Sequence, residues 1–426
     1  MRRVAAPLLL LVLAVGCAGR GALPTERLHV GTSGDYAPFS SAVEDRIEGF
    51  DLTLARAFAA DTGLELEFQR FAWPTLSRDV GAGHFDVAMS GVTVRPERSV
   101  IGRFSVPVAR SGAVVLTRAV HADGGLDGLD RPDVTIAVNQ GGHLERAARE
   151  RFPHAGLRPL PENDAVRRAL ADGEVDALVT DTLEAPHWQS RIPGAVRLGP
   201  FTSDRKAYLW SLPADHAERL DAWLLAREAD GSLARWRERW LGAPGPPTAT
   251  PLAALVAALG ERLSLMPAVA EAKRRSGRAV RDRAREAQVL ESAFAGVERH
   301  AAEFGVVTPP RPQVDAFYRA QIEAAVAIQG ETLAGPVSPG PRFDLTTELR
   351  PALLRLGQRI AWALVRLDGP ASRKELSRRV AAELSPYDLD PAHQDALVDA
   401  LQALAQSRAS ARANSPAITG SASEAP

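Results

Sequence analysis

The stretch Gly83-His-Phe-Asp-Val-Ala-Met-Ser-Gly-Val-Thr93, followed by Arg95-Pro-Glu-Arg98, decides the fold of the first half of this 426-residue chain. Its apolar centre predicts a buried strand. Ser90 and Thr93 follow this strand with hydroxyl and backbone donors. Arg98 adds a planar guanidinium group, which can bind a carboxylate through two parallel hydrogen bonds. Taken alone, Arg98 would be interpreted as a solvated helix arginine. The interpretation that it binds a ligand therefore depends on the surrounding sequence pattern.

Around this stretch, from about residue 28 to residue 240, short apolar runs alternate with amphipathic runs. The apolar runs predict buried strands at Leu28–Gly31, Leu64–Phe68, Phe85–Met89, Ala113–Thr117, Thr135–Asn139 and Ala177–Thr180. The amphipathic runs predict helices at Leu52–Thr62, Thr75–Ala82, His143–Phe152 and Asn163–Asp172. This alternation is typical of an α/β fold.

Three segments in this order closely resemble the two-lobed periplasmic solute-binding fold. Leu28–Gly31 runs into Thr32-Ser-Gly-Asp-Tyr-Ala-Pro-Phe39, Glu48-Gly-Phe-Asp-Leu52 opens a helix, and the stretch that ends at Arg98 follows. The resemblance implies a type II binding-protein fold, in which two α/β lobes close over a small ligand. It also implies that the arginine at the position of Arg98 grips the carboxylate of that ligand.

Four further segments resemble cyclohexadienyl dehydratase, an enzyme built on this scaffold. They are Phe71-Ala-Trp-Pro-Thr-Leu76, Val138-Asn-Gln-Gly-Gly142, Val179-Thr-Asp-Thr-Leu-Glu184 and Asp204-Arg-Lys-Ala-Tyr208. The resemblance implies that Glu184 is the general acid, which protonates the departing C4 hydroxyl of prephenate while the C1 carboxylate leaves as carbon dioxide. Such a reaction needs cations for two carboxylates and one acid with a raised pKa.

The same resemblance implies a substrate site in this half of the chain. Arg98 and Lys206 are the expected carboxylate binders, and Asn139 is an expected hydrogen-bonding partner. The other substrate-binding residues expected here are Trp73, Ser90, Thr93 and Asp181. His143 stands where the family usually has a threonine, so the substrate pose and the choice between prephenate and arogenate stay open.

The second half has a different composition. We expect residues 25–242 to form the first domain, residues 243–251, which are rich in proline, to form a stiff linker, and residues 252–408 to form an all-α domain. Helical periodicity covers Pro251–Arg275, Ala284–Phe304, Gln313–Gln329, Thr346–Leu367, Ser372–Ser385 and Pro391–Ser407. Residues 409–426 are rich in serine and alanine and predict a disordered tail.

Charged residues in the helical half recur on shared faces. Arg262 and Lys273 are 11 residues apart, which is three helical turns. Asp282, Arg285 and Glu286 are spaced i, i+3 and i+4. A solvated charged face would explain any one of these residues. Basic residues directed into a helical core would be costly unless a bound anion neutralised them.

Together, these residues fall at the spacings of the all-helical chorismate mutases, and the region resembles their secreted subclass over about residues 252–359. The resemblance implies that Arg262 and Arg285 bind carboxylates, with Asp282 beside them. It also implies that Lys273 and Gln329 donate to the ether oxygen, that Glu286 receives the ring hydroxyl, and that Arg359 supplies the last cation. The implied reaction is a pericyclic rearrangement in which no proton moves, so fixed donors are sufficient.

The overall charge excludes one class of partner. The chain has 51 basic and 52 acidic residues, a formal charge of −1, and therefore no electrostatic footprint for nucleic acid. Its single cysteine, Cys17, excludes intrachain disulfides. The histidines show no metal-ligand spacing, and neither expected reaction needs a metal or an organic cofactor.

The N-terminus predicts export. Met1-Arg2-Arg3 precedes an apolar run, Val4–Gly16, that is too short to cross ~30 Å of hydrocarbon, so residues 1–17 read as a signal peptide. Leu13-Ala-Val-Gly-Cys17 resembles a bacterial lipobox, which implies that Cys17 is acylated. The alternative is ordinary cleavage near Ala18. We therefore expect a periplasmic or exported protein that touches a membrane only through this anchor.

The two halves predict one function. A mutase makes prephenate from chorismate and a dehydratase consumes prephenate. We therefore expect an exported bifunctional enzyme that makes phenylpyruvate. Conversion of arogenate to phenylalanine stays open as an alternative reaction of the dehydratase half. The competing hypothesis is an amino-acid-binding lipoprotein with a non-catalytic helical appendage. Glu184 argues against it, because a binding protein has no use for an acid at that position.

Overall fold

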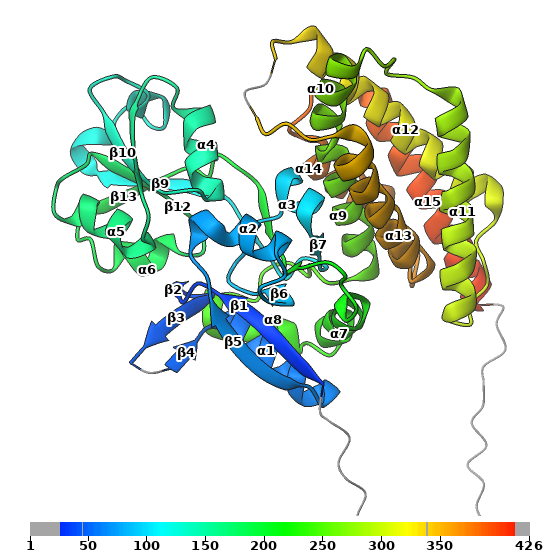
Figure 1. Cartoon of the computed structure of the whole chain (residues 1–426), viewed down its shortest axis with the longest axis horizontal. Coiled ribbons are helices and arrows are strands. Elements are labelled where there is room, and N and C mark those ends of the chain that lie inside the picture. The colour runs from blue at the N-terminus through cyan, green and yellow to red at the C-terminus, as the bar shows by residue number, and fades with distance from the viewer. Residues whose placement is uncertain (1–25, 45, 338–339, 414–426) are drawn as a thin grey trace, which may run out of the picture.

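The computed structural model describes residues 26–44, 46–337 and 340–413. In them the first half of the chain forms two α/β lobes, and the second half forms a helical domain beside them (Figure 1). Cys17, the predicted signal peptide and residues 414–426 lie outside the described residues.

Lobe 1 is built on a five-stranded sheet with the order β5-β1-β6-β15-β7. Its strands are β1 (Arg27–Thr32), β5 (Glu65–Arg70), β6 (Val87–Ala88), β7 (Arg103–Phe104) and β15 (Leu209–Trp210). Its helices are α1 (Phe50–Thr62), α2 (Leu76–Gly81), α3 (Pro96–Ile101), α7 (Ala217–Ala229) and α8 (Ser232–Leu241). A small antiparallel sheet flanks them, with β2 (Asp35–Tyr36), β3 (Ser40–Val43) and β4 (Arg46–Glu48).

Lobe 2 is built on a second five-stranded sheet with the order β11-β10-β12-β9-β13. Its strands are β9 (Ala113–Arg118), β10 (Thr135–Asn139), β11 (Gly156–Leu160), β12 (Ala177–Asp181) and β13 (Ala195–Leu198). Its helices are α4 (His143–Arg151), α5 (Asn163–Ala171) and α6 (Ala185–Gln189). The chain crosses between the lobes twice, and the two crossings pair as the antiparallel ribbon of β8 (Ala109–Ser111) and β14 (Asp204–Lys206).

All six predicted strands are present, and the predicted α/β fold is confirmed. The burial predicted for Leu64–Phe68 is confirmed for Leu64 and wrong for the rest of the run, because the following residues belong to β5, an edge strand whose residues are exposed or half-buried. The strands that the sequence did not predict include β2, β7, β8 and β15. Each of these is only two or three residues long, too short to show an apolar period.

The helical domain is all-α, as predicted. Its helices are α9 (Pro251–Ser264), α10 (Met266–Ser276), α11 (Arg283–Glu303), α12 (Arg311–Ala334), α13 (Arg350–Val365), α14 (Arg373–Leu384) and α15 (Pro391–Ala413). The helix predicted over Pro251–Arg275 is two helices, because Pro267 lacks the N–H that would continue the ladder. The tail predicted from residue 409 is also wrong as far as residue 413, because α15 continues to Ala413. The buried Arg408 fixes this end by donating to the carbonyls of Val307 and Val365.

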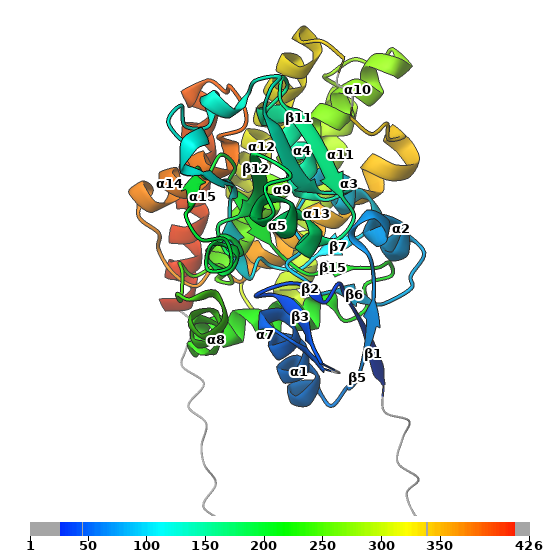
Figure 2. The same cartoon turned by 90° about the vertical axis from the view of Figure 1, so that its left-hand side faces the viewer.

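The helical domain is joined to lobe 1 rather than to lobe 2. One apolar core runs without a break from lobe 1 into the helical domain, whereas lobe 2 has two separate cores on the faces of its own sheet. The proline-rich segment is docked as well, since the backbone N–H groups of Thr248 and Ala249 both donate to Glu228 at 3.0 Å. Figure 2 shows the lobes and the helices from the side.

Among the described residues, one helical run has the length and composition of a membrane span, and it is Pro251–Ser276. This run is α9 with α10, and 72% of its most apolar window is buried inside the protein. It is therefore a core helix of the helical domain.

Candidate active sites

The first candidate site lies between the two lobes, in a region that we call the lobe cavity. Its volume is about 40 Å³, enough for a few water molecules, so the lobes must separate to admit a larger ligand. The polar and aromatic residues that line it include Tyr36, Trp73, Thr93, Arg98, Asn139, His143, Asn163 and Lys206. They come from both lobes, so the cavity exists only while the lobes are closed.

Glu184 lies directly behind this cavity, after the end of β12 and just before α6. It is buried, and it accepts hydrogen bonds from Asn163 Nδ2 at 2.6 Å and Thr180 Oγ1 at 2.7 Å. Burial raises the pKa of Glu184 well above its usual range, and the charge of Asp181 raises it further. The raised pKa favours the protonated form of Glu184, which can act as an acid.

Asn163 also orients the carboxyl group of Glu184. The Nδ2 group of Asn163 donates to the carbonyl of Asp35 at 3.2 Å as well, which fixes the orientation of its amide. Both oxygens of Glu184 are thus held, Oε1 by Asn163 and Oε2 by Thr180.

Asp181 and Lys206 form a buried ion pair at the edge of the cavity. Lys206 Nζ lies 2.9 Å from Asp181 Oδ2, and it donates to Tyr36 Oη at 2.8 Å and to Thr93 Oγ1 at 3.0 Å. Tyr36 also donates a short hydrogen bond to Asp181. Burial alone would raise the pKa of Asp181, but Lys206 and Tyr36 hold it below its usual range. The environments of two neighbouring carboxyl groups thus shift their pKa values in opposite directions, down for Asp181 and up for Glu184.

Arg98 is a buried cation that faces the cavity without a partner anion. Its Nη1 donates to the carbonyl of Thr93 at 3.0 Å, and it makes no ion pair with any described carboxylate. Burial lowers the pKa of Arg98 to about 10, so the group stays charged near pH 7. Asn139 adds a buried Nδ2 that has no hydrogen-bond partner among the described residues. A carboxylate would satisfy both groups.

His143 joins the two lobes at the rim of the lobe cavity. Its Nδ1 lies 2.9 Å from Arg95 Nη1 of lobe 1, and its Nε2 lies 2.9 Å from Asp204 Oδ2. Arginine can only donate, so Nδ1 is the acceptor and the proton resides on Nε2. A bidentate ion pair between Arg146 of α4 and Glu97 of α3 reinforces this link.

The structure brings most of the residues expected at this site together. Trp73, Thr93, Arg98, Asn139 and Lys206 line the cavity, and Asp181 contacts Lys206 behind it. The expectation for Ser90 is wrong, because its hydroxyl does not line the cavity. It packs instead with the hydroxyls of Ser40 at 2.6 Å and Ser33 at 2.8 Å. The sequence analysis also missed Tyr36 and Asn163, whose roles depend on contacts between lobes.

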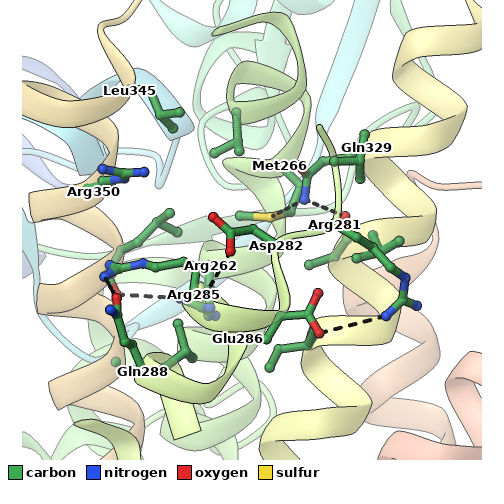
Figure 3. Close-up of a pocket in the computed structure, with 18 of the residues that line it drawn as sticks. Arg262, Met266, Arg281, Asp282, Arg285, Glu286, Gln288, Gln329, Leu345 and Arg350 are labelled. Atoms are coloured by element: carbon green, nitrogen blue, oxygen red, sulfur yellow. Dashed lines mark hydrogen bonds and ion pairs between the residues drawn. The ribbon is translucent and has the colours of Figure 1, made fainter. Parts of the chain in front are cut away.

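The second candidate site is a cavity of about 590 Å³ between α9, α10, α11, α12 and α13, which we call the helical cavity (Figure 3). Its charged lining residues are predominantly basic. They are Arg262, Lys273, Arg278, Arg281, Arg285 and Arg350, against the acids Asp282 and Glu286. This excess of positive charge suits a small dianion.

Arg262 and Gln329 each keep a buried polar atom that has no hydrogen-bond partner in the described part of the chain. Arg262 Nη1 reaches the carbonyl of Leu353 only at 3.5 Å, and its Nε has no partner. Burial lowers the pKa of Arg262, and the charge of Arg285 lowers it further. Gln329 donates to the carbonyl of Ala325 at 3.0 Å, while its Oε1 has no partner. Both side chains are thus available to a ligand.

Four other expected residues also line the helical cavity, and they are Lys273, Asp282, Arg285 and Glu286. Lys273 Nζ donates to the carbonyl of Val280 at 2.6 Å, and burial lowers its pKa while Asp282 opposes that shift. Asp282 is the N-cap of α11 and accepts from the backbone N–H of Arg285 at 3.0 Å. Glu286 Oε2 lies 3.8 Å from Arg281 Nη1. Figure 3 shows the carboxylates of Asp282 and Glu286 among the basic side chains.

The expectation for Arg359 is wrong. Arg359 does not line the helical cavity; its Nη1 pairs with Glu261 Oε2 at 2.6 Å and its Nη2 donates to the carbonyl of Ser105 in lobe 1 at 3.2 Å. Arg350 of the same helix lines the cavity instead. The two arginines are nine residues apart, about two and a half helical turns, so they lie on opposite faces of α13.

Residues 28–243 match the family model of the bacterial extracellular solute-binding proteins, family 3. The chain belongs to this family. Residues 253–330 match the model of chorismate mutase type II. Solute-binding proteins of family 3 are described as extracellular, which agrees with the export expected from the sequence.

The relatives of the solute-binding half include both an enzyme and binding proteins. The chain is 36% identical to cyclohexadienyl dehydratase of Pseudomonas aeruginosa over 223 residues, which are 50% of this chain and 82% of the relative. It is 26% identical to the arginine-binding extracellular protein ArtP of Bacillus subtilis, covering 50% of this chain and 86% of that protein. A crystal structure of an ancestral amino acid-binding protein, a precursor of cyclohexadienyl dehydratase, is 32% identical with a TM-score of 0.47, covering 50% of this chain and 95% of that one.

These matches confirm three expectations. The chain joins a dehydratase-like solute-binding half to a chorismate mutase half, its fold classes are those predicted, and it is an enzyme.

Proposed function

We propose that the protein converts chorismate to prephenate in the helical cavity and prephenate to phenylpyruvate in the lobe cavity. The observation that carries the second activity is the pair of buried, differently partnered carboxyl groups: Asp181 pairs with Lys206, whereas Glu184 has no cationic partner among the described residues and has a raised pKa. A protein that only binds a ligand has no need of a buried acid behind its cavity.

In the lobe cavity, Glu184 gives its proton to the C4 hydroxyl of prephenate, and that hydroxyl leaves as water. The electron pair of the bond between the ring and its carboxylate moves into the ring, carbon dioxide departs, and the ring becomes aromatic. Glu184 then regains a proton from solvent when the lobes open. Dianionic prephenate and one proton thus give monoanionic phenylpyruvate, carbon dioxide and water.

Arg98 holds the carboxylate that stays, on the pyruvyl side chain. The ring carboxylate loses its charge as it becomes carbon dioxide, and a cation bound tightly to it would stabilise the substrate more than the transition state. Lys206 is better suited to that end of the substrate, because its charge is already shared with Asp181 and Tyr36.

In the helical cavity, the protein holds the chorismate side chain over the ring and stabilises charge on the ether oxygen. Arg262, Arg285 and Arg350 are the proposed carboxylate binders, and Lys273 is the proposed donor to the ether oxygen. Gln329 joins Lys273 once its amide leaves the carbonyl of Ala325. Glu286 accepts the ring hydroxyl.

Two features favour a keto acid over an amino acid as the ligand of the lobe cavity. Arogenate and free amino acids carry an ammonium group that needs an acidic partner. Among the described residues that line the cavity none is acidic, and Asp181 at its edge already holds Lys206. Both arogenate and the binding-protein alternative are therefore less suited to this site.

For the location of the protein, we propose export with a lipid on Cys17. The lipobox-like sequence before Cys17 supports the anchor, and the extracellular family supports export.

The test of the proposed function follows two substrates separately in full-length protein. Chorismate loss and phenylpyruvate formation are measured for the wild type, Glu184→Gln and Arg262→Ala. We expect Glu184→Gln to let prephenate accumulate from chorismate, and Arg262→Ala to stop chorismate consumption while added prephenate is still consumed. Wild-type protein that leaves prephenate untouched and binds an amino acid would contradict the proposal.

A further inference from the structure

Helix α3, which carries Arg98, lies between α2 of lobe 1 and α9 of the helical domain (Figure 1). It contacts α9 and α13 of the helical domain. Arg98 faces the lobe cavity from this helix, and Glu97 reaches lobe 2 through its ion pair with Arg146. The placement of Arg98 therefore depends on what holds the far side of α3.

The side of α3 is held by a buried carboxylate of the helical domain. Ser99 Oγ donates to Glu261 Oε1 at 2.8 Å, and the other oxygen of Glu261 pairs with Arg359 at 2.6 Å. All three side chains are buried. A hydrogen bond to a buried carboxylate has a defined geometry and no competing water, so it fixes the rotation of α3.

The end of α3 is held by α13. Arg355 Nη2 donates to the carbonyls of Ser99 at 3.2 Å and Val100 at 2.8 Å. These carbonyls belong to the last turn of α3, where they have no partner within the helix. A cation there also interacts favourably with the negative end of the helix. The helical domain thus holds α3 both laterally and at its C-terminus.

We propose that Ser99, Glu261 and Arg355 position Arg98 for the substrate carboxylate, so that the helical domain is a part of the dehydratase and not merely its neighbour. Lobe 2, whose cores are separate, closes against this fixed helix. The inference rests on the proposed function and adds positioning residues that lie outside both cavities.

The test uses Ser99→Ala in the full-length protein. We expect the KM for prephenate to rise about tenfold, the factor that corresponds to ~1.4 kcal/mol. The kcat should stay within about twofold, because Glu184 is untouched, and the rate of chorismate consumption should not change. Ser99→Thr keeps the hydroxyl and should restore the KM. The matched control is Ser276→Ala, which removes a serine hydroxyl that bonds only to carbonyls of its own helix.

Arg355→Gln provides a second variant in case Ser99→Ala does not fold. An unchanged KM in whichever of these variants folds overturns the proposal. So does a joint fall of kcat, mutase rate and melting temperature that Ser99→Thr does not restore, because that pattern marks a general structural role.

Failure of the proposed dehydratase activity can be distinguished from failure of the positioning role. If the wild type does not consume prephenate, that function is wrong. The affinity for prephenate is then compared by calorimetry between Glu184→Gln/Arg262→Ala and the same chain with Ser99→Ala. A weaker affinity in the triple variant supports the positioning role independently of turnover. Equal affinities, or no binding in either chain, contradict it.

Discussion

Asn163 donates one hydrogen bond to Glu184 at 2.6 Å and another to the carbonyl of Asp35 at 3.2 Å. Asn163 lies in lobe 2 and Asp35 in lobe 1, so one amide both orients Glu184, the proposed acid, and contacts the opposite lobe. The orientation of Glu184 is therefore coupled to the contact between the lobes.

The first prediction concerns pH. Glu184 is active when protonated, so kcat for prephenate should fall as pH rises through its raised pKa. The hydrogen bond that Asn163 donates to Glu184 is one of the interactions that lower this pKa. Asn163→Leu should therefore shift the high-pH limb of kcat upward, while the loss of orientation lowers the plateau about tenfold. A limb that moves to lower pH would contradict this assignment.

The second prediction separates two arginines of one helix. Arg350→Ala should lower the mutase kcat/KM by about tenfold or more, because it removes a cation from the helical cavity. Arg359→Ala leaves the buried Glu261 without its partner, so it should cost about 3–5 kcal/mol of stability. Chorismate kinetics and denaturant unfolding of the two variants check this; a mutase defect confined to Arg359→Ala would refute it.

The third prediction concerns the binding of the substrate carboxylate by Arg98. Arg98→Lys keeps the charge but loses the planar fork, so the KM for prephenate should rise at least about tenfold. Chorismate consumption should be unaffected, because Arg98 lies outside the helical cavity. Steady-state kinetics with each substrate measure both effects, and an unchanged KM would exclude Arg98 as the carboxylate binder.

The fourth prediction concerns closure of the lobes. Burial lowers the pKa of His143, and Arg95 and Lys206 lower it further, against Asp204. The closed form therefore binds the proton more weakly than an open form, whose histidine titrates near about 6.5. Closure is fully stabilised above that pH and weakens as pH falls toward the lowered value, because a proton on Nδ1 would face Arg95.

The measurement is the KM for prephenate between pH 5 and 8, where it should rise on the acid side. His143→Gln accepts from Arg95 without titrating in this range, so its KM should stay flat from about pH 6.5 downward. The same acid rise in both proteins would assign the effect to another group.

The fifth prediction tests the anchor. Wild-type protein made in bacteria should carry acyl chains on Cys17 and sediment with membranes, and Cys17→Ser should be released as soluble protein. Mass spectrometry of the N-terminal peptide distinguishes this from cleavage near Ala18, which would leave no Cys17.

The sequence by itself determined the two fold classes and most of the chemistry. Apolar runs such as Thr135–Asn139 predicted strands because a strand buried on both faces must be apolar. The spacing of Arg262 and Lys273 predicted a shared cavity, and both residues line it although Pro267 breaks the helix between them. The spacing remains informative across this break because a single residue, Leu265, separates α9 from α10.

Only the tertiary structure decided which charged groups face a ligand and which face each other. Arg359 looks like a cavity residue in sequence, yet it is neutralised by Glu261, a partner 98 residues away. Ser90 follows a strand at the expected place, but its hydroxyl forms hydrogen bonds with the hydroxyls of Ser33 and Ser40. Partners far apart in the chain leave no local pattern, because burial and charge pairing depend on how the lobes and the helices pack against one another.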